Sequence, residues 1–204
     1  VHPSLCEGGA LTQPIVIASS SGGSGSFSYE WYMGTSPISA AINTLISGNG
    51  TTLNYTSPIN QTTYFKRRTI DQGQGFDSSF VTINVNSIPS AAITRTPSNS
   101  PIPDGATVTL QVPVVNGGSY TWAPTGGTTN ANQYTVAPLN TTTYTATVTD
   151  GSGCSSTSTL QVVVDPLLPG TLNNQALCGA QSATAITGNP ATGGDPSNYL
   201  YGWE

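Results

Sequence analysis

The chain repeats itself at two distances, and this periodicity limits its fold more than any other feature of its 204 residues. Two segments 172 residues apart share a cysteine, a glycine, a tyrosine and a tryptophan in one order: Cys6, Gly22, Tyr29, Trp31 and Cys178, Gly194, Tyr201, Trp203. Self-similarity at a fixed offset is typical of tandem arrays. The end of the chain therefore reads as the beginning of a second copy of its start.

A shorter repeat lies inside that period, since Thr62-Thr63-Tyr64 returns as Thr142-Thr143-Tyr144 after 80 residues. Each copy follows a proline and precedes an alternating stretch, a Gly/Asp turn, a β-branched stretch and a proline-containing joint. These joints predict a first unit at 1–87, a second at 88–166, and a truncated further copy of the first at 167–204. We therefore expect the chain to be a piece of a longer protein.

The residue pattern favours strands throughout, and no stretch of ten residues has a helical period. Residues 27–33 alternate, with aromatic or apolar side chains at every second position. Short strands between glycine-rich turns, in units of 80–90 residues, predict an all-β chain of tandem immunoglobulin-like β-sandwich repeats. The expected strands are 14–18, 27–33, 51–56, 62–70, 79–85, 91–95, 106–112, 119–122, 133–136, 142–149 and 157–164.

Aromatic residues fall where such sandwiches place core markers, on the third strand and at the opening of the penultimate one. The expected core markers are Trp31, Tyr64, Trp122, Tyr144 and Trp203. The second cysteine of an immunoglobulin domain would lie two residues after each tyrosine. Lys66 and Ala146 hold those positions, so neither unit has that disulfide.

The motifs Tyr120-Thr121-Trp122, Asn140 to Asp150 and Gly153-Cys154 resemble the immunoglobulin-like and PKD-like repeats of Bacteroidota surface proteins. The segments Cys6-Glu7-Gly8 and Tyr29-Glu30-Trp31 resemble a sister repeat. Such arrays occur in very large secreted adhesins, including gliding-motility adhesins of the SprB type. The resemblance implies export by the type IX secretion system and display as cell-surface filaments.

The three cysteines depart from the pattern of these repeats. Phe76 and Pro103 stand where the family would place the partners of Cys6 and Cys154. Cys6, Cys154 and Cys178 thus have no evident partner within their own units. Cys6 and Cys154 are either free or paired across units, and a partner of Cys178 would lie beyond residue 204.

Composition excludes several classes of function. The net charge is −5 with four basic residues, which argues against nucleic-acid binding, and no apolar run is long enough for membrane insertion. Nucleophile, phosphate-loop and paired-histidine motifs are absent, so we expect no enzyme and no cofactor. Aspartates in turns could ligate calcium, but turn chemistry explains each of them separately: Asp71, Asp77, Asp104, Asp150 and Asp195.

One surface site stands out, since Lys66, Arg67 and Arg68 are three of the four basic residues. Their functional interpretation, together with outward-pointing Tyr32, is a site for an anionic polysaccharide or surface. The favoured alternative is a solvated strand whose charges pair with Asp71 and Asp77.

The leading hypothesis is a non-catalytic, structural and adhesive segment of a long extracellular cell-surface filament. Its partners would be neighbouring repeats and an extracellular polysaccharide or solid surface. Two alternatives remain: an accessory spacer or carbohydrate-binding module of a secreted hydrolase, and a pilin-like subunit that polymerises by strand donation.

Overall fold

A computed structural model describes residues 4–18, 22–47, 50–124, 127–128, 131–182, 184–194 and 199–202. The chain forms two compact units, Val1–Ile88 and Pro89–Glu204. The all-β expectation is confirmed, because the one helical segment in these ranges is the single 3-10 turn η1 (Ser39–Ala41). No helix in the described ranges is long and apolar enough to cross a membrane.

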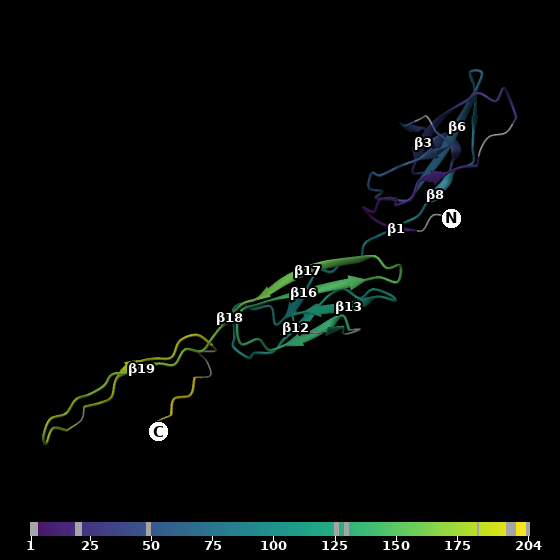
Figure 1. The fold of residues 1–204 in the computed structure, drawn as a ribbon. Coiled ribbons are helices and arrows are strands. Elements are labelled where there is room, and N and C mark those ends of the chain that lie inside the picture. Colours follow the sequence, from purple (N-terminus) through teal and green to yellow (C-terminus); the bar gives the residue numbers. More distant parts are fainter. Residues whose placement is uncertain are drawn as a thin grey trace. The chain divides into compact units, whose positions relative to one another are not determined.

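Unit one is a sandwich built around a five-stranded sheet in which β3 and β6 lie side by side (Figure 1). The order of that sheet is β4-β3-β6-β7, with β8 also paired to β6, and β2 pairs with β5 in the facing sheet. Its strands are β1 (Leu5–Cys6), β2 (Ile15–Val16), β3 (Phe27–Gly34), β4 (Thr44–Ser47), β5 (Thr52–Leu53), β6 (Thr63–Asp71), β7 (Gln74–Asp77), β8 (Val81–Ile83) and β9 (Val85–Asn86).

The core of unit one forms where the inward residues of β3 and β6 meet β2 and β5. Its buried members are Ile15, Trp31, Leu53, Ile59, Phe65 and Ile83. Trp31 also donates its indole N–H to the Gly50 carbonyl at 3.1 Å, so its polar atom is satisfied. The strand alternation predicted for 27–33 thus places its tryptophan in the core.

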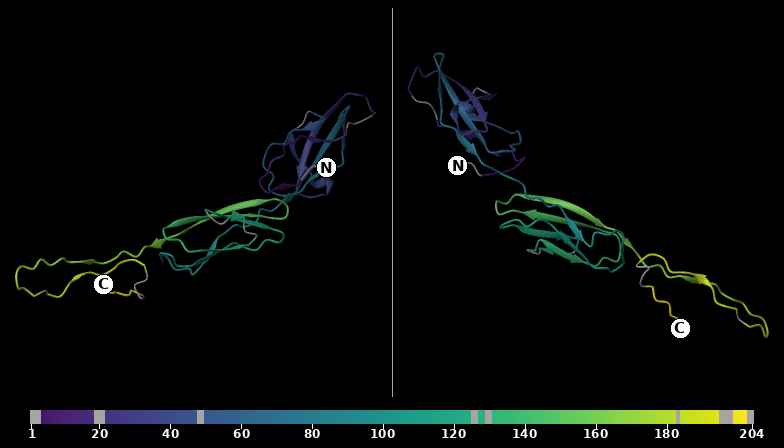
Figure 2. Two further views of the ribbon diagram at one scale, coloured as in Figure 1. Left: turned by 60° about the horizontal axis from the view of Figure 1, so that its bottom comes forward. Right: turned by 180° about the vertical axis from the view of Figure 1, so that it is seen from behind.

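Unit two has a three-stranded sheet, β10-β12-β15, and a four-stranded sheet, β14-β13-β16-β17. The long hairpin β16–β17 is clear in both views of Figure 2. The strands of unit two are β10 (Thr94–Thr96), β11 (Ile102–Pro103), β12 (Val108–Gln111), β13 (Ser119–Ala123), β14 (Gly127–Thr128), β15 (Gln133–Val136), β16 (Thr142–Thr149), β17 (Ser155–Val162) and β18 (Val164–Asp165).

The core of unit two is larger than that of unit one and is rich in valine. Trp122 and Tyr144 are both buried in it, and Tyr134 packs on both rings with centroid distances of 5.8 and 6.2 Å. Burial raises the pKa of the Tyr144 phenol. Both sequence-derived core markers of this unit therefore lie inside it.

The structure aligns the two units with an offset that differs by one residue from the sequence alignment, which matched Thr62 with Thr142. Thr62 Oγ1 accepts the Val85 amide at 3.2 Å, and Thr141 Oγ1 accepts the Val164 amide at 3.0 Å. Both threonines accept from the first residue of the last strand of their sandwich, β9 or β18. Thr62 therefore corresponds to Thr141 and not to Thr142.

This one-residue slip corrects the placement of Tyr64 as a core marker. Side chains alternate along a strand, so a slip of one moves each to the other face. Phe65, fully buried, takes the place of Tyr144, and Tyr64 lies half-buried on the outer face against Phe80. The fifth expected marker, Trp203, lies outside the described residues.

The described residues from 167 onward form little regular structure. The two short strands β19 (Thr171–Leu172) and β20 (Gly188–Asn189) pair in antiparallel fashion. None of the described residues after 166 is buried, and the leucines there are about half exposed or more. The described residues of this part therefore form no core of their own.

Candidate binding surface

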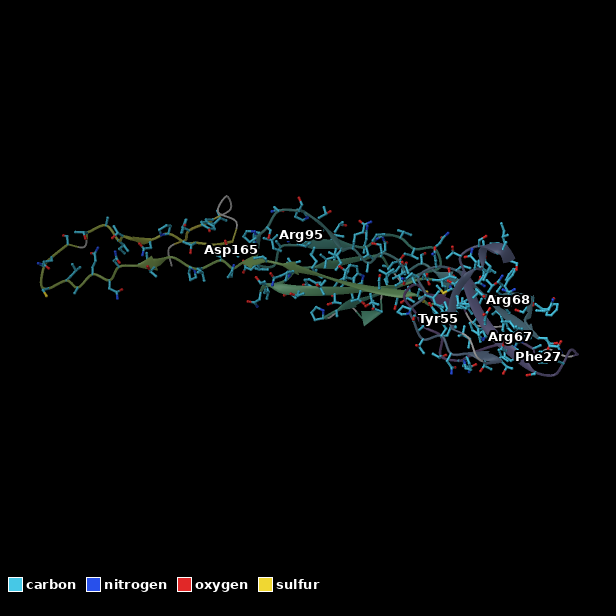
Figure 3. All side chains as sticks on the ribbon, turned by 90° about the horizontal axis from the view of Figure 1, so that it is seen from above. Phe27, Tyr55, Arg67, Arg68, Arg95 and Asp165 are labelled. Atoms are coloured by element: carbon cyan, nitrogen blue, oxygen red, sulfur yellow. The ribbon has the colours of Figure 1, made fainter. Side chains whose placement is uncertain are left out.

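The basic run of β6 divides between the two faces of its sheet. Trp31 is the cross-strand partner of Arg67, and Glu30 is the partner of Arg68. Cross-strand partners share a face, so Arg67 points to the core and Arg68 to the outside. Both are labelled in Figure 3.

Arg67 is not a surface residue, which corrects the expectation that it contributes to a binding site. Its side chain is 2% exposed and donates to the carbonyls of Ile17 at 3.2 Å, Ala18 at 2.7 Å and Thr51 at 3.2 Å. Its guanidinium also lies over the Tyr29 ring, 4.6 Å from the centroid.

These contacts make Arg67 a clasp between the two sheets of unit one. The three accepting carbonyls lie just after β2 and just before β5, in the sheet that faces β6. In unit two the corresponding residue across from the tryptophan is Ala146, which is buried and apolar. Arg67 thus spans the sandwich at a place where the other unit needs only a methyl group.

Lys66 points outward but is covered, so it too departs from the expected surface site. It is 7% exposed, donates to the Ser39 carbonyl at 3.0 Å and lies 5.6 Å from the centroid of the Tyr32 ring. The turn η1 reaches this place because Gly34 has no Cβ, which would stand 2.6 Å from the Ala41 carbonyl oxygen.

Arg68 is the exposed cation of the run, and it sits in a small polar group. Glu30 lies directly across from it in the sheet, and the Tyr32 hydroxyl donates to the Glu30 carboxylate at 2.6 Å. That hydrogen bond raises the pKa of the Tyr32 phenol. The Arg68 guanidinium occupies the space where a Cβ of Gly75 would be, so the glycine makes room for it.

Two aromatic rings extend this group along the same face. The rings of Tyr64 and Phe80 meet edge to face at a centroid distance of 5.4 Å, and Phe80 is 39% exposed. We call this surface the unit-one face: Glu30, Tyr32, Tyr64, Arg68 and Phe80. It combines exposed ring area with one cation and one carboxylate, which can stack on a sugar and hydrogen-bond to its hydroxyl or carboxylate groups.

The aspartates of the turns serve local hydrogen bonds. Asp71 accepts the Ser24 hydroxyl and the Ser24 amide, the latter at 2.9 Å, which lowers the pKa of its carboxyl. Asp150 accepts the amides of Ser152 and Cys154, both at 2.9 Å, and Asp104 accepts that of Leu167 at 3.4 Å. No three potential metal ligands gather among the residues that the structure describes. Asp195 and the side chain of Asp77 lie outside the description.

The cysteines divide into two kinds. Cys6 and Cys154 are disulfide-bonded, and Cys178 is a free, exposed thiol. The alternative in which Cys6 and Cys154 are free is therefore wrong.

No protein-family model matches the sequence, and no curated protein matches it significantly. Among solved structures, the amphioxus IgVJ-C2 molecule shares 13% identity at a TM-score of 0.31, over 78% of this chain and 99% of that one. Sidekick-1 immunoglobulin domains 1–5 share 17% identity at a TM-score of 0.26, over 81% of this chain and 38% of that one. The Bacteroides ovatus mixed-linkage glucan utilization locus protein SGBP-B, in complex with a mixed-linkage heptasaccharide, shares 11% identity at a TM-score of 0.30. The match covers 96% of this chain and 60% of that one. The chain spans less than two thirds of the length of the Sidekick-1 and SGBP-B structures.

Proposed function

We propose that this chain is a non-catalytic, structural and adhesive segment of an extracellular cell-surface filament. The observation that carries the proposal is shared by both units. In each, a strand near the beginning pairs in parallel with a strand near the end: β1 with β9, and β11 with β18. This arrangement suits a unit that is pulled at its two ends.

The parallel pairs place hydrogen bonds in the path of a tensile load. The Leu5 amide donates to the Asn84 carbonyl and the Glu7 amide to the Asn86 carbonyl, both at 2.9 Å. In unit two the Ile102 amide donates to the Val163 carbonyl at 3.0 Å. Tension on parallel strands that leave in opposite directions shears such bonds together, so they resist as a group.

The adhesive part of the proposal rests on the unit-one face. Its rings and its Arg68–Glu30 pair suit an extracellular polysaccharide, whereas Lys66 and Arg67 are occupied within the fold. The sequence resemblance to Bacteroidota repeats supports type IX secretion and a role in gliding or surface attachment as the setting of this adhesion.

One observation favours a second candidate, a carbohydrate-binding accessory module of a secreted hydrolase. Such a module needs exposed rings on one face, and Tyr64 and Phe80 provide a short row. In that case the parent protein would be of moderate size and would carry a catalytic domain elsewhere.

Electron microscopy of intact cells, and of protein sheared from them, tests the choice when paired with a denaturing gel. Beaded threads whose polypeptide runs far above 20.9 kDa are expected for a covalent repeat filament. Threads that separate into subunits of about that size would instead indicate a polymerised pilin-like protein. A moderate-sized chain without threads would support the accessory module.

A further inference from the structure

The outer face of the larger sheet of unit two is a registered array of hydroxyl groups. Thr121, Thr147 and Thr157 stand side by side on β13, β16 and β17, and Ser119, Thr149 and Ser155 form the next row. We call this surface the hydroxyl face: Ser119, Thr121, Thr143, Thr145, Thr147, Thr149, Ser155, Thr157 and Thr159.

Strand geometry fixes the spacing of the array. Rows repeat about every 6.8 Å along a strand, and columns about every 4.8 Å across strands. Opposite positions on these strands are buried, as with Trp122, Ala146 and Val148, so the sheet is anchored from behind. Thr147 and Thr157 share a hydrogen bond at 3.2 Å between their hydroxyl oxygens, which orients the centre of the array.

The hydroxyl face carries no charge, and this limits what it can bind. The charged residues among the described part of unit two are Arg95, Asp104, Asp150 and Asp165, and none is a member of the face. A polyanion needs cations to replace its counterions. A protein partner usually needs large aromatic or arginine anchors, which this face lacks.

We propose that the hydroxyl face binds neutral polysaccharide laid along β13, β16 and β17. Each serine or threonine offers one donor and two acceptor lone pairs, the same set that a sugar hydroxyl offers in return. The threonine methyl groups add small apolar patches for the C–H faces of sugar rings. An uncharged ligand also loses least when it leaves water for a surface without counter-charges.

The affinity of one face is modest, because a hydrogen bond exchanged with water contributes only about a two- to twelvefold factor. The array is held rigid by its backbone ladder, so little freedom is lost on binding. In a filament, tandem copies would act together and raise the avidity. The inference thus rests on the proposed adhesive function and gives it a ligand class.

A retention assay tests this with the whole chain on microcrystalline cellulose, chitin and insoluble β-1,3-glucan, with alginate gel as the charged comparison. We expect retention on at least one neutral polymer, with little change between low and high salt. Retention on alginate through Arg68 of the unit-one face should fall as salt is raised, and it should not change when the hydroxyl face is altered. The triple variant T121V/T147V/T157V removes one row of hydroxyls and keeps β-branched side chains. It should lower affinity at least about tenfold, since three hydrogen bonds at the low end of that range together give about this factor.

The other sheet supplies a matched control. Thr96, Thr109 and Thr135 form a single row of three hydroxyls on β10, β12 and β15, and the next row on that face, Thr94, Gln111 and Gln133, does not continue the array. The variant T96V/T109V/T135V should bind as the unaltered chain does, and urea unfolding should show both variants folded. The proposal is overturned if no neutral polymer retains the chain, or if both variants lose affinity equally. Electron microscopy would still show filaments in those cases. A failure of the hydroxyl-face proposal is therefore distinguishable from a failure of the proposed filament function.

Discussion

At the scale of single residues, Arg67 is the most consequential side chain of unit one. A charged group is rarely buried unless it finds partners. Here three backbone carbonyls accept from the terminal nitrogens of Arg67, and the Tyr29 ring lies against its guanidinium. The neighbouring Arg68 has the same chemistry but lies on the surface. The pair therefore separates the effect of burial from that of charge.

Replacing Arg67 by methionine should destabilise unit one by about 2 kcal/mol, because the carbonyls lose a charged donor while apolar volume is largely kept. Urea unfolding of the variant measures this. The control is R68M, which should change stability by no more than about 0.5 kcal/mol. Equal losses in the two variants, or a gain in R67M, would contradict the role of Arg67 as a clasp.

Asp71 predicts a dependence of stability on pH. Its folded pKa lies below the ordinary value of 3.8 because the Ser24 hydroxyl and amide donate to it. The carboxylate therefore stabilises the fold above that ordinary value, and the contribution is lost as pH falls through the folded pKa. Carboxyl NMR titration should show the lowered pKa, and S24G should return it toward 3.8. An unchanged pKa in S24G would show that the Ser24 hydroxyl is not its cause, since the variant keeps the amide.

At the scale of elements, the sequence predicted the long strands well and the short ones poorly. Alternation over Thr142–Thr149 and Gln133–Val136 placed both strands at their observed bounds. Two-residue strands such as β1 and β11 are too short to alternate, and they exist only because a partner strand lies beside them. The one-residue slip between units was also hidden, because adjacent threonines make either alignment look equally good.

The burial of Arg67 follows from that slip. The sequence alignment matches Arg67 with Thr147 and so predicts that it points outward. The observed strand pairing matches it with Ala146 and places it in the core. Composition could not reveal this, since the carbonyls that accept from Arg67 come from segments far away in the sequence. Only the pairing of β3 with β6 decides which of three adjacent basic residues points inward.

The parallel pair β1–β9 predicts the mechanical response of unit one. Glu7→Pro removes the amide that donates to Asn86, while proline suits the turn closed by the Gly9–Cys6 hydrogen bond. Single-molecule stretching in reducing buffer should give a lower unfolding force for E7P than for E7A, which keeps the amide. Equal forces for the two variants would place the load elsewhere in the unit.

At the scale of the whole molecule, each unit has its own core. We therefore expect calorimetry to resolve two transitions. R67M should lower the midpoint temperature of the unit-one transition by about 10 °C. V148A, which truncates a fully buried residue of unit two, should lower only the midpoint of the unit-two transition. A single transition, or two that move together, would show that the units unfold as one.

The Arg67 clasp also bears on how such a unit could be made. Two sheets joined by a cystine require an oxidant and the correct pairing of thiols before the domain is complete. A guanidinium that donates to carbonyls needs neither, and it re-forms whenever the strands meet. The sandwich of unit one can thus close its two sheets in a reducing or an oxidising compartment alike, with no enzyme to assist the step.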